Sequence, residues 1–115
     1  MANKKYIAVF EIKSWLGIMQ HIVKGENASD LLYSFEDIQS LECLVRHGRY
    51  EEDKKGQKEL DKLESFLYKR DAGDLTIDEL KKLDITLSLG HIKCLEILGG
   101  DGAEEQIKSF FPNAK

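Results

Sequence analysis

Four glycines divide this chain into segments of nearly equal length. Gly25, Gly48, Gly73 and Gly99 lie 23, 25 and 26 residues apart, and a basic residue or a histidine shortly precedes the first three. Glycine adopts the left-handed conformation that ends a helix, and a cation in the last turn meets the negative end of the helix dipole. The spacing therefore predicts four helical units of about twenty residues each.

The composition fits a single helical domain. The chain has 115 residues, of which 42% are hydrophobic and 33% charged, and its single proline, Pro112, lies close to the C-terminus. A chain of this size can bury a core without disulfides or metals, and without proline little interrupts its helices. We expect one domain over residues 1–115 with an all-α fold, a compact bundle of four to five helices, with or without a short N-terminal strand. The alternative is an α+β fold with strands near 5–12 and 84–97.

Residues 11–24 have the hydrophobic pattern of an amphipathic helix that Gly25 would end. The apolar positions that share one arc of a helical wheel are Ile12, Trp15, Leu16, Ile18, Met19, Ile22 and Val23. Residues 6–10 fit either an extension of this helix or a short strand, because the run Tyr-Ile-Ala-Val-Phe is rich in strand-forming residues.

Two further helices are expected in the middle of the chain. Asn27 or Ser29 can cap the first of them, which would end at Gly48. A charged connection over 49–56 follows. The next helix has its apolar positions at Leu60, Leu63, Phe66 and Leu67.

The strongest local signal is a helix start at Thr76. Thr76 and Glu79 have the spacing of a capping box, and Leu75 and Leu80 lie where a hydrophobic staple would form. We favour a helix that continues through 98, broken or unbroken at Gly90. The alternation of polar and apolar residues in 84–89 allows a hairpin instead, with its turn at Gly90.

The end of the chain also has a helical pattern. Residues 90–104 resemble the second helix of an ankyrin repeat, which supports a helix at 91–98. Asp101 or Gly102 would begin a last short helix that Pro112 ends.

No pattern in the sequence indicates catalysis, a metal or a cofactor. The three histidines lack the spacing of helix-borne metal ligands, and the two cysteines, Cys43 and Cys94, do not form a Cys-x-x-Cys motif. Cys43 and His47 are four residues apart, but no oxyanion loop accompanies them, so a packed thiol is the simpler interpretation. We expect no enzyme, no metal and no cofactor.

The chain is expected to lie in the cytoplasm. No stretch has the order of a signal peptide or the length of a membrane span, and both thiols are expected to be free. A Cys43–Cys94 disulfide would require their two helices to face each other.

His21 has a second interpretation beside that of an exposed histidine near a helix end. The run His21-Ile-Val-Lys24-Gly25 resembles the His-x-x-Lys-Gly core of histidine phosphotransfer domains. That resemblance implies a four-helix bundle in which an exposed histidine in the middle of a helix, here His21, carries a phosphoryl group. The chain departs from the pattern because Gly25 is expected to end the helix, whereas the family's helix continues past its glycine.

The leading functional hypothesis is a small, acidic, non-enzymatic module that binds another protein, as an adaptor, an immunity-type protein or an inhibitor. The net charge is −4, so the chain lacks the broad positive surface that direct nucleic-acid binding needs. An acidic surface would attract a basic partner, including a protein that handles nucleic acid. No membrane contact is expected, and the sequence does not indicate an oligomeric state. Tyr50 beside Arg49 is a further candidate contact, since both residue types are common in binding hot spots. The candidate acidic face comprises Asp71, Asp74, Asp78, Glu79, Asp101, Glu104 and Glu105.

Overall fold

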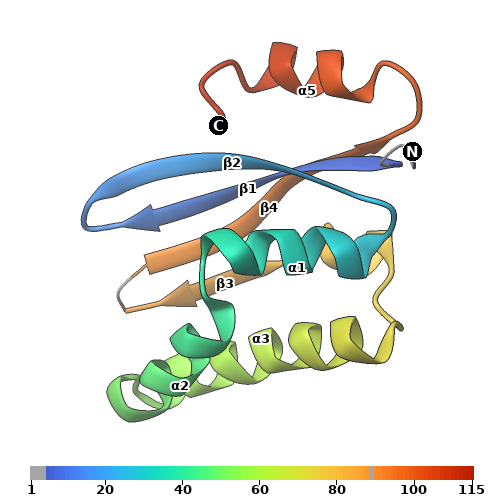
Figure 1. Ribbon diagram of the computed structural model, residues 1–115. Helices are drawn as coiled ribbons and strands as arrows, with labels where there is room; N and C mark the ends of the chain where they lie inside the picture. Colours follow the sequence, from blue (N-terminus) through green and yellow to red (C-terminus); the bar gives the residue numbers. More distant parts are fainter. Residues whose placement is uncertain (1–4, 89) are drawn as a thin grey trace.

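The protein has an α+β fold, which contradicts the expected all-α bundle and agrees with the alternative. The computed structural model describes residues 5–88 and 90–115. A four-stranded antiparallel sheet forms the centre (Figure 1). The elements in chain order are β1 (Tyr6–Ser14), β2 (Gly17–Gly25), α1 (Ala28–Ile38), α2 (Leu41–Glu51), α3 (Lys54–Ala72), α4 (Ile77–Leu80), β3 (Asp84–Leu87), β4 (Gly90–Gly99) and α5 (Ala103–Phe110).

The sheet has the strand order β2-β1-β4-β3, so β2 and β3 form its two edges. Tyr6 pairs with Gly25 on one side and with Gly99 on the other, and a bulge lies between Val9 and Phe10 in the β1–β4 ladder. The two central strands therefore come from opposite ends of the chain.

Helices cover both faces of the sheet. α1, α2 and α3 lie on one face, and α5 lies on the other (Figure 1). Side chains alternate along a strand, so successive residues of β1 enter different cores. Ala8 and Phe10 pack with α1 and α3, whereas Ile7 and Val9 pack with α5. The Phe10 ring stacks on Phe35 with 4.3 Å between ring centroids.

The helix expected over residues 11–24 is wrong. These residues form the end of β1, a tight turn and β2. The helical arc arose because the turn exposes Trp15 and Leu16, and because β2 carries apolar residues on both of its faces, among them the exposed Ile18 and Met19. A helical wheel shows only where apolar residues recur along the chain. It therefore cannot distinguish exposed apolar residues at a turn from the buried face of a helix.

The helix expected over 77–98 is also wrong beyond its first turn. α4 ends at Leu80, and the chain continues as the β3–β4 hairpin. The alternation of polar and apolar residues in 84–89 was the informative pattern, because β3 buries Ile85 and exposes Asp84 and Thr86. The segment that resembles an ankyrin helix is strand β4.

Of the four evenly spaced glycines, only Gly73 ends a helix. Gly73 has a φ of 75° and caps the C-terminal end of α3, where its N–H donates to the Arg70 carbonyl. Gly25 and Gly99 end strands β2 and β4. Gly48 lies inside α2, where a Cβ would approach a Leu60 side-chain carbon within 2.7 Å. This glycine permits close packing of α2 on α3.

The remaining local signals are confirmed. The Asn27 side chain accepts the Asp30 N–H at 2.8 Å and caps α1. Thr76 and Glu79 form both hydrogen bonds of the capping box. The third and last helices occur where the apolar spacing placed them. The helix expected to end at Gly48 is divided into α1 and α2, and α2 continues past this glycine to Glu51. The connection expected over 49–56 is therefore wrong, because only Glu52 and Asp53 separate α2 from α3.

Candidate interaction site

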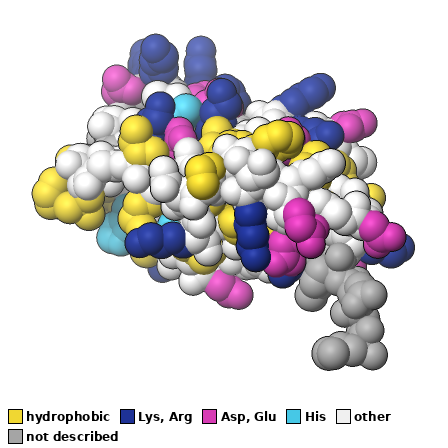
Figure 2. Space-filling model, turned by 90° about the horizontal axis from the view of Figure 1, so that it is seen from above, with side chains coloured by type: hydrophobic (Ala, Val, Ile, Leu, Met, Phe, Trp, Pro, Cys, Tyr) yellow, Lys and Arg dark blue, Asp and Glu magenta, His cyan; other side chains and the backbone are white. Residues whose placement is uncertain are grey.

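The turn between β1 and β2 exposes two large apolar side chains. Trp15 is 85% exposed and Leu16 is 78% exposed. The Ser14 hydroxyl accepts the Leu16 N–H at 3.2 Å, and Gly17 has a φ of 122°, a conformation that favours glycine. Hydrophobic side chains gather at this end of the molecule (Figure 2). The conformation of the turn therefore leaves the side chains of Trp15 and Leu16 exposed to solvent.

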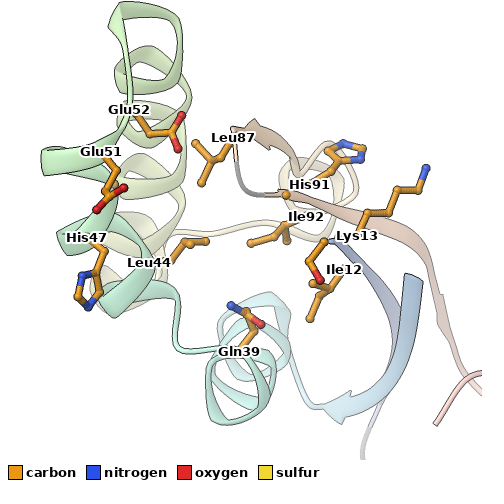
Figure 3. A pocket seen from close by; sticks show the side chains of 13 residues that line it. Ile12, Lys13, Gln39, Leu44, His47, Glu51, Glu52, Leu87, His91 and Ile92 are labelled. Atoms are coloured by element: carbon orange, nitrogen blue, oxygen red, sulfur yellow. The ribbon is translucent and has the colours of Figure 1, made fainter. Parts of the chain in front are cut away.

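A cleft of about 160 Å³ lies beside this turn, between α2 and the ends of β1, β3 and β4. Figure 3 shows the side chains around it. Its apolar lining consists of Ile12, Leu44, Leu87 and Ile92.

The rim of the cleft is polar. His47 and His91 lie on opposite sides of it (Figure 3). His91 contacts the Asp84 carboxylate through its Nε2 atom. The Glu52 carboxylate accepts the Ser88 hydroxyl at 2.7 Å, so it ties the C-terminal end of α2 to the end of β3. Glu52 therefore supports the wall of the cleft.

The turn and the cleft belong to one surface. A shallow hollow continues from the cleft and is lined by Trp15 together with Lys13, Leu87 and His91. We call this the hairpin-end surface. It comprises Trp15, Leu16, Ile12, Leu44, Leu87 and Ile92. The sequence placed Trp15 in a predicted helix and so did not identify this surface.

The structure divides the predicted acidic face into residues that hold the fold together and residues that do not. Glu79 is paired with Lys69 and belongs to the capping box. Glu104 accepts hydrogen bonds from Lys24 and Lys108, which lower the pKa of its carboxyl to about 2. These contacts attach α4 to α3 and α5 to β2.

The other predicted acids are exposed. Asp74 and Asp78 lie near the C-terminal end of α3, and Asp101 and Glu105 lie at the start of α5. None of these four forms an ion pair with residues 5–88 or 90–115. Both groups lie at the end of the molecule opposite the β1–β2 turn (Figure 1).

Asp71, the remaining predicted acid, belongs to a charged cluster around Arg70. The Arg70 side chain is 3% exposed, and it bonds to Glu36 at 2.7 Å and to Asp71 at 2.9 Å. Its guanidinium stacks 4.2 Å above the Tyr33 ring, and the Tyr33 hydroxyl donates to Asp71 at 2.6 Å. This hydrogen bond, with that from Arg70, lowers the pKa of Asp71. From the sequence, Arg70 was expected only to be a cation near the end of the helix that Gly73 stops.

Arg49 and Tyr50 differ in their surroundings. Arg49 bonds to Asp61 and Glu64 on α3, so it joins α2 to α3. Tyr50 is 89% exposed. Of this predicted pair, only the tyrosine is free to contact a partner through its whole side chain.

His21 lies on β2, half-buried and directly opposite Phe10. The resemblance to phosphotransfer domains implied an exposed histidine within a helix bundle, and both premises are contradicted. Lys24, expected one helical turn away, is paired with Glu104 on α5. We therefore do not propose phosphotransfer.

Both cysteines are free thiols, Cys43 half-buried and Cys94 buried. Burial, with a smaller contribution from Glu96, raises the pKa of the Cys94 thiol to about 12. Within the described ranges, no group of three or more histidine, cysteine, aspartate or glutamate side chains is arranged to hold a metal ion. In the same part of the chain, no helix combines the length and the apolar character needed to cross a membrane.

Comparison with protein-family models, with curated proteins and with solved structures found no match.

Proposed function

We propose that this chain is a small protein-binding module, and that its main contact with a partner is the hairpin-end surface. The observation that carries this proposal is the exposure of Trp15 and Leu16 beside an apolar cleft. Tryptophan is among the residues that contribute most to binding when buried at an interface. A soluble chain gains nothing for its own fold by exposing such a side chain.

The shape of the surface also supports a protein partner. A protruding turn next to a concave cleft gives both a side chain to insert and a pocket to receive one. The polar rim with His47, Glu51 and His91 surrounds an apolar centre, as in many protein interfaces.

The acidic end is proposed to contribute to the approach of the partner. Asp74, Asp78, Asp101 and Glu105 are exposed and unpaired within residues 5–88 and 90–115. Exposed acids mainly accelerate encounter with a basic partner and add little affinity. The partner would then be a basic protein, and the chain an adaptor, immunity-type protein or inhibitor. The free thiols fit the cytoplasm as its place of action.

Capture of a partner from the native host tests the proposal. The tagged chain is compared with the double variant Trp15→Ser, Leu16→Ser and with the charge-reversal variant Asp74→Lys, Asp78→Lys, Asp101→Lys. We expect the double variant to lose the partner and the charge-reversal variant to retain it at equilibrium. The captured protein is then purified, and its affinity for each variant is measured by calorimetry.

The opposite pattern would overturn the proposal. If the double variant keeps the affinity and charge reversal removes it, the contact lies at the acidic end. The far-ultraviolet circular dichroism of each variant shows whether the fold is intact.

A further inference from the structure

Strand β2 is an edge of the sheet with half of its backbone groups facing outward. In an antiparallel ladder, alternate residues direct their N–H and C=O groups toward the neighbouring strand. The Gln20 carbonyl accepts the Lys115 N–H from outside the sheet, so Ile18, Gln20 and Ile22 direct their backbone groups away from β1. Exposed edges of this kind are sites where another strand can add.

The outward-facing residues have a symmetric order. Ile18 and Ile22 lie at equal distances from Gln20. If two β2 strands pair in antiparallel fashion with Gln20 opposite Gln20 of a second copy, each Ile18 faces an Ile22. Cross-strand pairs of β-branched residues stabilise a sheet. The same register brings Met19 opposite His21 on the other face.

The start of this edge is open to such a strand, whereas the C-terminal segment covers its centre. α5 packs over β1 and β4, and α1 lies beneath β2 on the opposite face of the sheet. Ile18 is 62% exposed. In this register Gly17 faces Val23, so residues 17–23 of the two copies would pair.

The C-terminal segment lies on this same edge. Phe111 and Ala114 pack on the α5-side core, and the Lys115 N–H donates a hydrogen bond to the Gln20 carbonyl at 2.9 Å. A hollow remains between the segment and β2, lined by Ile18, Met19, Gln20, Asn113 and Lys115. The segment therefore covers the centre of the edge, but it does not fill the space beside Ile18 and Met19.

We propose that β2 pairs with β2 of a second copy of this chain, antiparallel about a two-fold axis at Gln20, and that residues 111–115 compete for this edge. This association goes beyond the proposed function and uses a different surface. It leaves the cleft between α2 and the sheet open, because that cleft lies at β1, β3 and β4.

A cysteine at the axis tests the register. Paired residues that exchange backbone hydrogen bonds have Cα atoms about 5.5 Å apart, which a disulfide can span. In a Cys43→Ala background, Gln20→Cys should give a disulfide-linked dimer under mild oxidation with glutathione. Ile18→Cys is the matched control, because two copies of residue 18 would lie about 13 Å apart in this register.

A proline tests the edge itself. Ile18→Pro removes an outward-facing N–H, so the monomer loses no hydrogen bond to β1, whereas Ile18→Val keeps the donor. Sedimentation analysis should show a concentration-dependent dimer for the native chain and Ile18→Val, and a monomer for Ile18→Pro. Circular dichroism confirms that Ile18→Pro is folded.

The competition is tested at Lys115. Lys115→Pro removes the N–H that Gln20 accepts, and Lys115→Ala keeps it. Loss of one hydrogen bond should strengthen dimer formation about fivefold in Lys115→Pro relative to Lys115→Ala.

Two results would overturn the proposal. The first is a chain that remains monomeric at its highest soluble concentration, with Lys115→Pro equally monomeric. The second is a dimer that Ile18→Pro leaves intact. Trp15→Ser separates this proposal from the proposed function, since it should weaken partner binding and leave the β2 dimer unchanged.

Discussion

Arg70 is the charged residue on which the packing of three helices depends. It comes from α3, bonds to Glu36 on α1 and to its neighbour Asp71, and stacks on Tyr33. Glu42 on α2 lies 3.5 Å from the same guanidinium. The carboxylates are partly exposed, so water screens part of this attraction. Arg70 itself is buried, and its contacts compensate the cost of removing its charge from water.

Replacing Arg70 should therefore weaken the fold. Arg70→Met keeps an unbranched apolar chain but leaves the three carboxylates without their shared cation. We expect the free energy of unfolding to fall by about 2–3 kcal/mol, measured by urea denaturation. Tyr33→Phe, which removes only the exposed hydroxyl bond to Asp71, should lower the stability less than Arg70→Met does. An unchanged stability of Arg70→Met would show that the cluster contributes nothing to the fold.

Glu104 should titrate at an unusually low pH. Hydrogen bonds from Lys24 and Lys108 lower its pKa to about 2, from an ordinary value of 4.5. A carboxyl with a lowered pKa contributes its stability above pH 4.5 and loses it as the pH falls toward 2. Carboxyl chemical shifts measured by NMR should show the low midpoint, and Lys24→Met should raise it. A midpoint near 4.5 in the native chain would contradict the Lys24–Glu104 contact.

At the scale of elements, the sequence specified helix ends better than it specified the sheet. The Asn27 cap, the Thr76 capping box and the stop at Gly73 are local signals, since each depends on residues within a few positions. β1 pairs with β4, whose residues lie 76 to 93 positions further along the chain, and no local pattern shows this pairing. Because β1 is buried on both faces, it also lacks the alternation that identifies a half-exposed strand.

The same reason explains what the sequence missed at the candidate site. The hydrophobic pattern predicts that Trp15 lies on the apolar face of a helix. The cleft is formed by residues from β1, α2, β3 and β4 that only the fold brings together. The sequence shows which residues are acidic, but it does not show which of them form ion pairs. Glu79 and Glu104 were therefore assigned to a partner although they bind Lys69 and Lys24.

Gly90 offers a test of how closely β1 and β4 approach at the cleft. A Cβ at Gly90 would lie 2.4 Å from the Lys13 carbonyl oxygen, which is backbone and cannot move aside cheaply. Gly90→Ala should destabilise the protein by about 1–3 kcal/mol in thermal or urea unfolding. Lys93→Ala, at an exposed position of the same strand, should change stability by less than about 0.5 kcal/mol. Equal stability of both variants would refute this close approach.

At the scale of the whole molecule, the two ends differ in chemistry. One end presents Trp15, Leu16 and an apolar cleft, and the other presents unpaired acids such as Asp74 and Asp101. The sheet and its helices hold these ends apart (Figure 1). A partner that docks on the apolar end buries the larger hydrophobic area, whereas the acidic end acts at longer range.

Hydrogen–deuterium exchange of the chain, with and without its captured partner, tests the central claim most directly. Binding at the hairpin-end surface should slow exchange in peptides that cover residues 12–19 and 84–92. Peptides that cover 71–79 and 101–105 should change little. Protection confined to these acidic segments, with the peptide containing Trp15 unaffected, would contradict the assignment of the hairpin end as the binding surface.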